Sequence, residues 1–343
     1  MTMPNNITLA DAARILRRGE RVLIFTHHNP DGDCMGSAFA LLLMLHQMGK
    51  TARVVCGDPI PKRLIFTLRE QADCVYTEGM EADYDLLCAV DTASVGQLGS
   101  LGHLSEKIGV SMDHHGTGEV FCPAFVDPTA SAAGEILFDL YQMWREEGKL
   151  SPNADVARLL YTAIVSDTGS FKYSNTTKKT MLCAAELMGE IQSATDGGDD
   201  ISMLCHRLFE CRTLTELRAQ RAGIDSLRLE CDGQLGIVLF TQDMLRENGL
   251  SMEDIANIIG LPRTVDGVQI ALAIKQSPDE PTLWRISSRA NCDVDVSAVC
   301  ASFGGGGHRR AAGCSISAPD AESALATAVA AFGKALTNGE DKI

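Results

Sequence analysis

The chain has 343 residues, 45% of them hydrophobic and 22% charged, which is the composition of an ordinary soluble globular protein. Its formal net charge of -15 argues against long duplex nucleic acid as a partner, because such polymers are bound through many basic contacts to phosphates. The longest apolar run, residues 38–45, is too short to span a membrane, and we expect a cytoplasmic protein without a secretory leader or a membrane partner.

Short apolar runs alternate with helical segments through the first half of the chain. The runs that predict strands are residues 21–26, 52–56, 85–90 and 108–112. The segments that predict helices are residues 36–48, 131–147 and 153–166. This alternation is typical of an α/β domain with a doubly wound, mainly parallel sheet. Ligands of such sheets bind at the carboxyl ends of the strands, so we expect a site there.

The second half of the chain predicts a smaller α/β domain with a mixed sheet. A polar stretch rich in Gly and Asp, residues 193–200, has the composition of a linker, and a charged helical segment follows it over residues 201–228. The expected strands are then residues 235–240, 268–275, 282–288 and 311–316, and the expected helices are residues 251–259 and 321–336. We therefore predict a first domain over residues 1–192, a linker and connecting helix over residues 193–230, and a second domain over residues 231–337.

Twelve cysteines are scattered along the chain, and none forms a Cys-x-x-Cys pair. Several of them, including Cys56, Cys88 and Cys183, lie within apolar runs. In a cytosolic protein this pattern favours reduced thiols in the core over disulfides or a thiolate metal site.

Acidic residues and histidines follow the first expected strand. His27, Asp31 and Asp33 have the spacing H-x-x-x-D-x-D, and Pro30 and Gly32 suit the tight turning that would aim the three side chains at one cavity. Carboxylate oxygens with an imidazole nitrogen suit Mn²⁺, with Mg²⁺ or Co²⁺ as alternatives. Taken alone, the loop is also consistent with a capped turn that begins the next helix.

Three further segments of this kind follow in the first domain: Asp91, the triplet Asp113-His114-His115, and Asp167. A lone Asp after a strand is more often a helix cap than a ligand. Two adjacent histidines after a buried strand have little value for packing, so the triplet favours a ligand role. Carboxylates and imidazoles delivered from several strand and helix ends are a common way to hold two divalent metals over a phosphate.

The four segments resemble the four motifs of the DHH phosphoesterase superfamily. Residues 303–313, in which four glycines precede His308, Arg309 and Arg310, resemble the signature of the DHH-associated C-terminal domain. The chain length and the sequence His-Asn-Pro-Asp-Gly-Asp resemble those of the nanoRNase/pAp phosphatase branch. The resemblance covers nearly the whole chain, residues 7–332.

The resemblance implies six metal ligands, which are His27, Asp31, Asp33, Asp91, His114 and Asp167. Asp91 would be shared, with His27 and Asp31 on one metal and the other three ligands on the second. His28 is an alternative to His27 as the metal ligand, but the family's H-x-x-P-D motif favours His27. Cys34 departs from the family, whose members usually carry alanine at this position. Cysteine is small enough to be tolerated there, and the alternative is that a thiol near metals makes the site oxidisable.

The other two residues of the DHH triplet are the catalytic candidates. By the resemblance, His115 would face the substrate phosphate. Asp113 would orient a ligand histidine through the ring nitrogen that lies away from the metal.

A glycine cluster in the second domain is the candidate phosphate-binding segment. Residues 304–307 leave the backbone free to take positive φ and to approach a ligand, and their N–H groups would form an anion nest. Such a segment alone is usually an ordinary loop, but the neighbouring arginines favour phosphate binding. The candidate substrate-binding residues are Arg289, Gly305, Gly306, Gly307, His308, Arg309 and Arg310.

The resemblance implies a manganese-dependent enzyme with two metal ions. Its substrates would be short oligoribonucleotides and dinucleotides such as pApA and pGpG, cleaved to mononucleotides, and 3′-phosphoadenosine 5′-phosphate (pAp), cleaved to AMP and phosphate. Family members are often homodimers. The alternatives are a single-stranded DNA exonuclease or a pyrophosphatase of the same superfamily, and a regulatory nucleotide-binding protein without activity.

Overall fold

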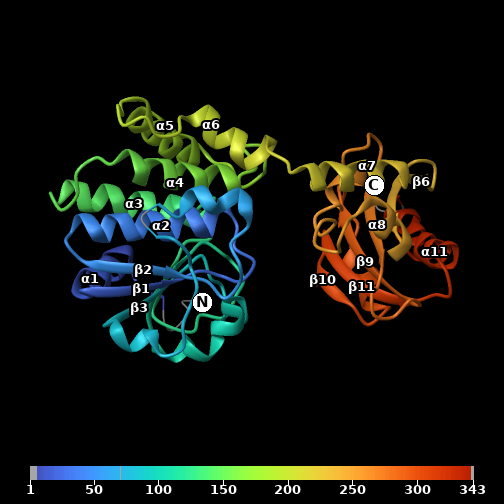
Figure 1. Ribbon diagram of the computed structural model, residues 1–343, viewed down its shortest axis with the longest axis horizontal. Coiled ribbons are helices and arrows are strands. Elements are labelled where there is room, and N and C mark those ends of the chain that lie inside the picture. The colour runs from blue at the N-terminus through green and yellow to red at the C-terminus, as the bar shows by residue number, and fades with distance from the viewer. Residues whose placement is uncertain (1–5, 70, 341–343) are drawn as a thin grey trace. The chain divides into compact units, whose positions relative to one another are not determined.

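The computed structural model describes residues 6–69 and 71–340, with side chains described as far as residue 336. Within it the chain divides into two compact units, whose boundary lies between Cys211 and Arg212 (Figure 1). This boundary falls inside the segment that we predicted as a linker, residues 193–230. We describe each unit by itself.

The first unit is built on a five-stranded sheet in which all paired strands are parallel. The strand order is β2 (Thr51–Val55), β1 (Arg21–Phe25), β3 (Leu86–Val90), β4 (Ile108–Asp113) and β5 (Ala124–Val126). This sheet confirms the predicted α/β class and most of the predicted strand bounds. Because β1, β3 and β4 are adjacent and parallel, their carboxyl ends lie side by side at one edge of the sheet.

Helices cover one face of this sheet, and a 3₁₀ segment covers the other. The α-helices are α1 (Leu9–Arg18), α2 (Gly32–Gln47), α3 (Ala133–Glu146), α4 (Ala154–Asp167) and α5 (Lys178–Gln192), and the 3₁₀ segments are η1 (Lys62–Thr67), η2 (Met80–Asp83) and η3 (Val95–Lys107). Alternate residues of β1 belong to the two layers: Ile24 packs in the core with the helices, whereas Phe25 packs in the core with η3.

Helix α2 is the centre of the first unit. In Figure 1 it lies between the sheet on one side and α3 and α4 on the other. Every residue from 32 to 45 is buried, which fits a helix that is apolar on all sides. A Cβ on Gly36 would lie 2.5 Å from the carbonyl oxygen of Leu159 in α4, so glycine permits the close crossing of α2 and α4. At this crossing, Gly32 at the start of α2 lies beside Ser166 near the end of α4.

The segment predicted as one connecting helix, residues 201–228, is broken in two. Helix α6 (Ile201–Cys205) and the π-helical turn after it, η4 (His206–Glu210), pack on the first unit. The backbone is extended at Cys211, and α7 (Leu214–Asp225) then begins with a capping box at Thr213 and packs on the second unit.

The second unit contains a six-stranded mixed sheet, as predicted. The strand order is β10 (Gly306–His308), β11 (Ala311–Ser317), β9 (Leu283–Ala290), β8 (Ile270–Gln276), β7 (Leu235–Phe240) and β6 (Arg228–Glu230). Only the β7–β8 pair of this sheet is parallel. Its helices are α8 (Gln242–Asn248), α9 (Gly260–Arg263), α10 (Val296–Ala301) and α11 (Ala321–Glu340). Of these, α10 and α11 pack against one face of the sheet, and α8 packs with α7 on the other.

The helix predicted over residues 251–259 is wrong, because this segment is a series of turns. Its backbone bonds join residues three apart, as from the N–H of Ala256 to the carbonyl of Glu253. The apolar spacing that predicted a helix is used instead to bury Ile255 and Ile258 against the sheet. Among the described residues, no helix is long and apolar enough to cross a membrane.

Candidate metal centre

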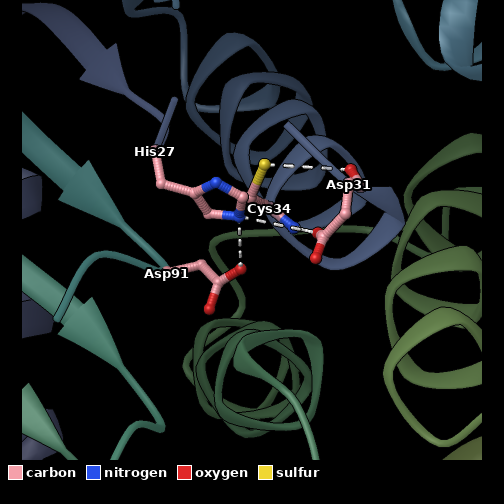
Figure 2. Close-up of side chains that lie close together, drawn as sticks. All are labelled: His27, Asp31, Cys34 and Asp91. Carbon is pink, nitrogen blue, oxygen red and sulfur yellow. Dashed lines mark hydrogen bonds and ion pairs between the residues drawn. The ribbon is translucent and has the colours of Figure 1, made fainter. Parts of the chain in front are cut away.

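The residues that the sequence singled out in the first unit come together at the carboxyl edge of the sheet. Figure 2 shows one group, in which the His27 imidazole faces the carboxylates of Asp31 and Asp91. The Nε2 atom of His27 lies 3.7 Å from Asp31 Oδ1 and 3.5 Å from Asp91 Oδ2. Cys34 also belongs to this group, since the four possible donor atoms all lie within 4.8 Å of one another. A divalent cation could be held here by nitrogen, oxygen and sulfur.

A second group lies beside the first and is centred on His114. Its Nε2 atom lies 3.7 Å from Asp33 Oδ2, 3.5 Å from Asp91 Oδ1 and 3.7 Å from Asp167 Oδ2. Asp91 therefore directs one carboxylate oxygen toward His27 and the other toward His114. All six residues that the resemblance implied as ligands are brought together, in two groups that share Asp91.

Asp91 provides the structural test of whether a cation fits. Its side chain is only 3% exposed, and its Oδ1 atom is buried without a hydrogen-bond partner. A buried carboxylate oxygen that faces an imidazole and has no donor carries a large desolvation cost, which a bound cation would offset. The donor set of carboxylates and imidazoles suits divalent metals. The residues present therefore fit a centre for two metal ions.

The loop after β1 holds the imidazoles of His27 and His28 in different places, and only that of His27 lies in a donor group. The Nδ1 atom of His27 lies 2.7 Å from the carbonyl oxygen of His28, which leaves Nε2 to face the carboxylates. The ring and the backbone N–H of His28 are both bonded to the carbonyl oxygen of Gln97, at 2.9 and 2.6 Å. His28 lies outside every donor group found among the described residues. The geometry therefore agrees with the choice of His27.

Asp31 and Asp33 have structural contacts as well as places in the donor groups. Asp31 is the N-cap of α2, and its Oδ1 atom accepts the N–H bonds of Asp33 and Cys34. Asp31 therefore caps the helix, as the alternative interpretation of this loop predicted, and it also lies in the first donor group. The carboxylate of Asp33 accepts the backbone N–H groups of Ala133 and Gly134 at the start of α3, at 2.7 and 2.9 Å.

Crowded carboxylates dominate the electrostatics of the centre. Burial raises the pKa of Asp33 well above its ordinary value, and neighbouring carboxylates, Asp91 first, add to the rise. Burial also raises the pKa of Asp167 to about 6. Burial lowers the pKa of His27, but its hydrogen bonds to Asp31 and Asp91 outweigh this effect and leave the pKa raised. Repulsion between neighbouring carboxylates contributes to the raised pKa of Asp33 and of Asp167, and a bound cation would relieve it.

His115 and Asp113 form a pair at the edge of the second group. Asp113 Oδ1 lies 2.7 Å from His115 Nδ1 and also accepts the backbone N–H groups of His114 and His115. This hydrogen bond raises the pKa of His115. We expected Asp113 to orient a ligand histidine, but the Nδ1 atom of His114 faces the carbonyl oxygen of Ala130 instead, at 3.4 Å. Asp113 thus contacts His115, which forms a possible donor group with Asp91 and His114, so its role in orienting a ligand histidine stays a prediction.

Two residues of the centre were missed or undervalued by sequence reasoning. Asn175 donates to the backbone carbonyls of Ser131 and Asp167 and lies 3.5 Å from the carboxylate of Asp167, so it fixes that ligand candidate. No spacing rule singles out an asparagine eight residues after an aspartate. Cys34 was noted only as a departure from the family, and its place in the first donor group depends on the start of α2.

In the second unit, three adjacent strands bring His308 and Arg289 to one face of the sheet. His308 in β10 pairs with Ala311 in β11, which in turn pairs with Arg289 in β9. Residues directly opposite one another in antiparallel strands share a face, so the small Ala311 side chain lies between the imidazole and the guanidinium. This is the face opposite the core that α10 and α11 cover, because Ala290 and Ala312 point into that core.

The other two arginines of the signature lie beside Asp293. Arg309 Nη2 donates to the carboxylate of Asp293 at 3.0 Å, and Arg310 Nη2 lies 3.8 Å from the same carboxylate. Both arginine side chains are more than half exposed, so these ion pairs are weak and can exchange with a bound anion.

The glycine cluster does not form the open anion nest that we predicted. The N–H groups of Gly304 and Gly305 donate to the carbonyls of Ala301 and Cys300 at the end of α10. A Cβ on Gly305 would lie 2.2 Å from the carbonyl oxygen of Gly313 in β11, and one on Gly307 would lie 2.6 Å from the carbonyl oxygen of Ala311 and 2.7 Å from the Cα of Ala312. These two glycines are therefore needed for close packing against β11, whereas Gly306 has open space around its Cα.

Comparison with known proteins finds a family match for each of the two units. The model of the DHH family, N-terminal domain, matches residues 21–164, and that of the DHHA1 domain matches residues 236–336. The bifunctional oligoribonuclease and PAP phosphatase NrnA of Thermus thermophilus is 28% identical over 317 residues, which are 92% of this chain and 90% of that protein. The protein of the same name from Bacillus subtilis is 25% identical over 300 residues, 87% of this chain and 90% of its own.

A solved structure shares the fold over nearly the whole chain. The exopolyphosphatase-related protein from Bacteroides fragilis superimposes with a TM-score of 0.80 at 20% sequence identity, covering 96% of this chain and 95% of its own. The two matched domains confirm the resemblance that the sequence motifs indicated.

Proposed function

The chain carries a DHH family N-terminal domain followed by a DHHA1 domain, and on this premise we propose that it is a two-metal-dependent phosphoesterase. Its proposed substrates are short oligoribonucleotides and dinucleotides, cleaved to mononucleotides, and pAp, cleaved to AMP and phosphate. The relatives whose names record oligoribonuclease and PAP phosphatase activities support this choice, since they align over most of the chain. The net charge of -15 supports short substrates over long ones.

One observation carries the proposal, and it is the shared position of Asp91. One of its oxygens lies 3.5 Å from His27 Nε2 and the other lies 3.5 Å from His114 Nε2. A single buried carboxylate between two imidazole and carboxylate groups is the arrangement that a bridged pair of cations requires. Two divalent cations, with Mn²⁺ our first choice, would neutralise phosphoryl oxygens there and lower the pKa of bound water.

The protein's own residues would position the substrate and assist the leaving oxygen. Asp113 holds the Nδ1 atom of His115, which leaves Nε2 free to contact a phosphoryl oxygen. The Asp113 carboxylate stabilises a protonated His115 ring, which would donate a hydrogen bond to such an oxygen. Asn175 fixes the backbone of Asp167.

In the second unit, Arg289 and His308 share the face of the sheet opposite α10 and α11 and are our proposed contacts for a second phosphate or the base of the substrate. Arg309 and Arg310 can add charge if an anion replaces Asp293.

Product analysis with four substrates tests the proposal. Protein stripped with EDTA and reloaded with Mn²⁺ is incubated with pApA, pAp, a long single-stranded RNA and pyrophosphate. We expect AMP from pApA and from pAp, with slow attack on the long strand and on pyrophosphate. Turnover of the long strand or of pyrophosphate alone would support the exonuclease or pyrophosphatase alternatives instead. Binding of pApA without turnover would support a regulatory protein.

A pair of matched variants links the activity to the centre. Asp91→Asn keeps the shape of the side chain but removes its charge. We expect kcat/KM to fall more than ~100-fold, because substitution of a residue that only hydrogen-bonds a metal ligand already causes a loss of up to about that size. The control is Asp83→Asn, an exposed aspartate in η2, which should leave the rate unchanged. Full activity in Asp91→Asn would refute the two-metal mechanism.

A further inference from the structure

The thiol of Cys34 lies within the first donor group and not merely near it. Its sulfur is within 4.8 Å of the donor atoms of His27, Asp31 and Asp91, and Figure 2 shows it beside the imidazole ring. Cys34 is fully buried, and its Sγ atom lies 3.8 Å from the carbonyl oxygen of Asp31. Among the residues that the structure describes, no other cysteine belongs to a donor group.

We propose that the Cys34 sulfur is a ligand of the first metal ion, so that this ion has nitrogen, oxygen and sulfur donors. The inference rests on the proposed two-metal function and deepens it. The resemblance to known proteins assigns only His27, Asp31 and Asp91 to this ion, so the sulfur would be an additional ligand.

The local backbone fixes the direction of the sulfur. Asp31 caps α2, and the N–H of Cys34 donates to its Oδ1 atom at 3.1 Å. Cys34 is thus the third residue of the helix, and its side chain projects from the first turn into the same space as the capping carboxylate. The close crossing at Gly36 leaves this turn little freedom to move.

Asp91 supports the presence of cations in the centre. Its carboxylate is the most deeply buried acidic group of this donor set, and its Oδ2 atom lies 3.5 Å from His27 Nε2. Its Oδ1 atom faces His114 in the second group and has no hydrogen-bond partner, as a carboxylate that bridges two cations would. The Cys34 thiol would reach the cation on the His27 side, because its sulfur lies within 4.8 Å of every other donor of that group.

Sulfur coordination has a chemical consequence for the choice of metal. A metal ion displaces the thiol proton to solvent and binds the thiolate, forming one metal–sulfur bond per ion. Thiolate ligands favour Zn²⁺, Co²⁺ and Cd²⁺ over Mg²⁺. The second group, formed by Asp33, Asp91, His114 and Asp167, contains no sulfur. The two positions of the centre should therefore differ in their metal preference.

Cobalt spectroscopy tests the sulfur ligand directly. The full-length protein is stripped with EDTA and titrated with Co²⁺, while absorption and bound cobalt are both measured. We expect a sulfur-to-cobalt charge-transfer band in the near ultraviolet that saturates with one of two bound ions. In Cys34→Ala the band should disappear while two ions still bind. The matched control is Cys56→Ala, since the sulfur of Cys56 lies 3.4 Å from the carbonyl of His27 but outside the donor group.

A competition experiment provides the second measurement. The affinity for Cd²⁺ should fall at least roughly tenfold in Cys34→Ala, whereas the affinity for Mg²⁺ should stay the same. Loss of a residue that only hydrogen-bonds a metal ligand already causes a decrease of this size. Two cobalt ions without a charge-transfer band in the unmodified protein would overturn the inference and leave the two-metal function intact. A band that persists in Cys34→Ala would do the same. A protein that binds no cobalt at all would overturn both.

Discussion

Asp33 is the residue whose substitution best separates the stability of the fold from the metal centre. Its carboxylate accepts the N–H groups of Ala133 and Gly134 and the hydroxyl of Ser37, at 2.7, 2.9 and 3.0 Å. The N-cap residue of α3, Ala132, has no side-chain acceptor of its own. Asp33 therefore caps α3 from a position 100 residues earlier in the chain.

Replacement of Asp33 by alanine should destabilise the metal-free first unit. Two buried N–H groups lose their acceptor, and each costs about 1–3 kcal/mol. Removing a carboxylate that Asp91 and Asp167 repel offsets part of this cost, so we expect a net loss of about 3 kcal/mol. In a unit of this size, that loss lowers the midpoint of thermal unfolding by roughly 6–12 °C.

Asp167→Ala is the matched control for this experiment. Asp167 belongs to the same donor group, but its carboxylate has only long contacts, at 3.5 Å with Asn175 and at 3.7 Å with His114. Its removal should change the free energy of unfolding by less than about 0.5 kcal/mol, as at a partly exposed site. Both variants should lose activity.

Calorimetry in EDTA measures the difference, because a bound metal stabilises the folded state and would hide it. Hydrogen exchange at the N–H groups of Ala133 and Gly134 locates the loss, since both should exchange faster only in Asp33→Ala. If Asp33→Ala and Asp167→Ala shift the unfolding midpoint equally, Asp33 is not the cap of α3 and the reasoning is refuted.

Three further predictions concern the catalytic pair and the second unit. Asp113→Asn should retain both metal ions but lower kcat roughly 10–100-fold, because the ring of His115 loses its charged partner and keeps only a neutral amide oxygen as acceptor. A lower metal content would contradict this. Gly305→Ala should destabilise the second unit by about 1–3 kcal/mol through overpacking. Gly306→Ala should be neutral or stabilising by up to about 1 kcal/mol. Equal midpoints of urea unfolding for the two variants would contradict this prediction. Arg289→Lys keeps the charge but loses the bidentate fork, so KM for pApA should rise several-fold at constant kcat; a change in kcat alone would show that Arg289 has another role.

The sequence predicted the features that depend on short-range patterns. The strand over residues 235–240 matches β7, because a short apolar run between polar turns identifies a buried strand. The convergence of His27, Asp91 and His114 followed from their places after parallel strands, which end at one edge of the sheet. These inferences needed only the order of the elements.

Features that depend on distant contacts could not be predicted from the sequence. The bond from Asp33 to the start of α3 joins residues about 100 positions apart. The glycine cluster indicated an anion nest, but Gly305 is required by its close approach to Gly313, which is known only once β10 and β11 are paired. The apolar spacing over residues 251–259 resembles that of a helix, but turns are enough to bury Ile255 and Ile258. Only the contacts with the sheet show this.

The backbone of Asp91 shows that the centre is built at the expense of local stability. Its φ of 57° lies in the left-handed region, which costs about 1–3 kcal/mol for a residue other than glycine. Glycine would remove this strain, but it would also remove the carboxylate that both donor groups share. The N–H of Asp91 donates to the carbonyl oxygen of Met112, which ties the end of β3 to β4 and holds the strained residue in place. An aspartate that is strained, buried and incompletely bonded at this position is best explained by the cations that it would bridge.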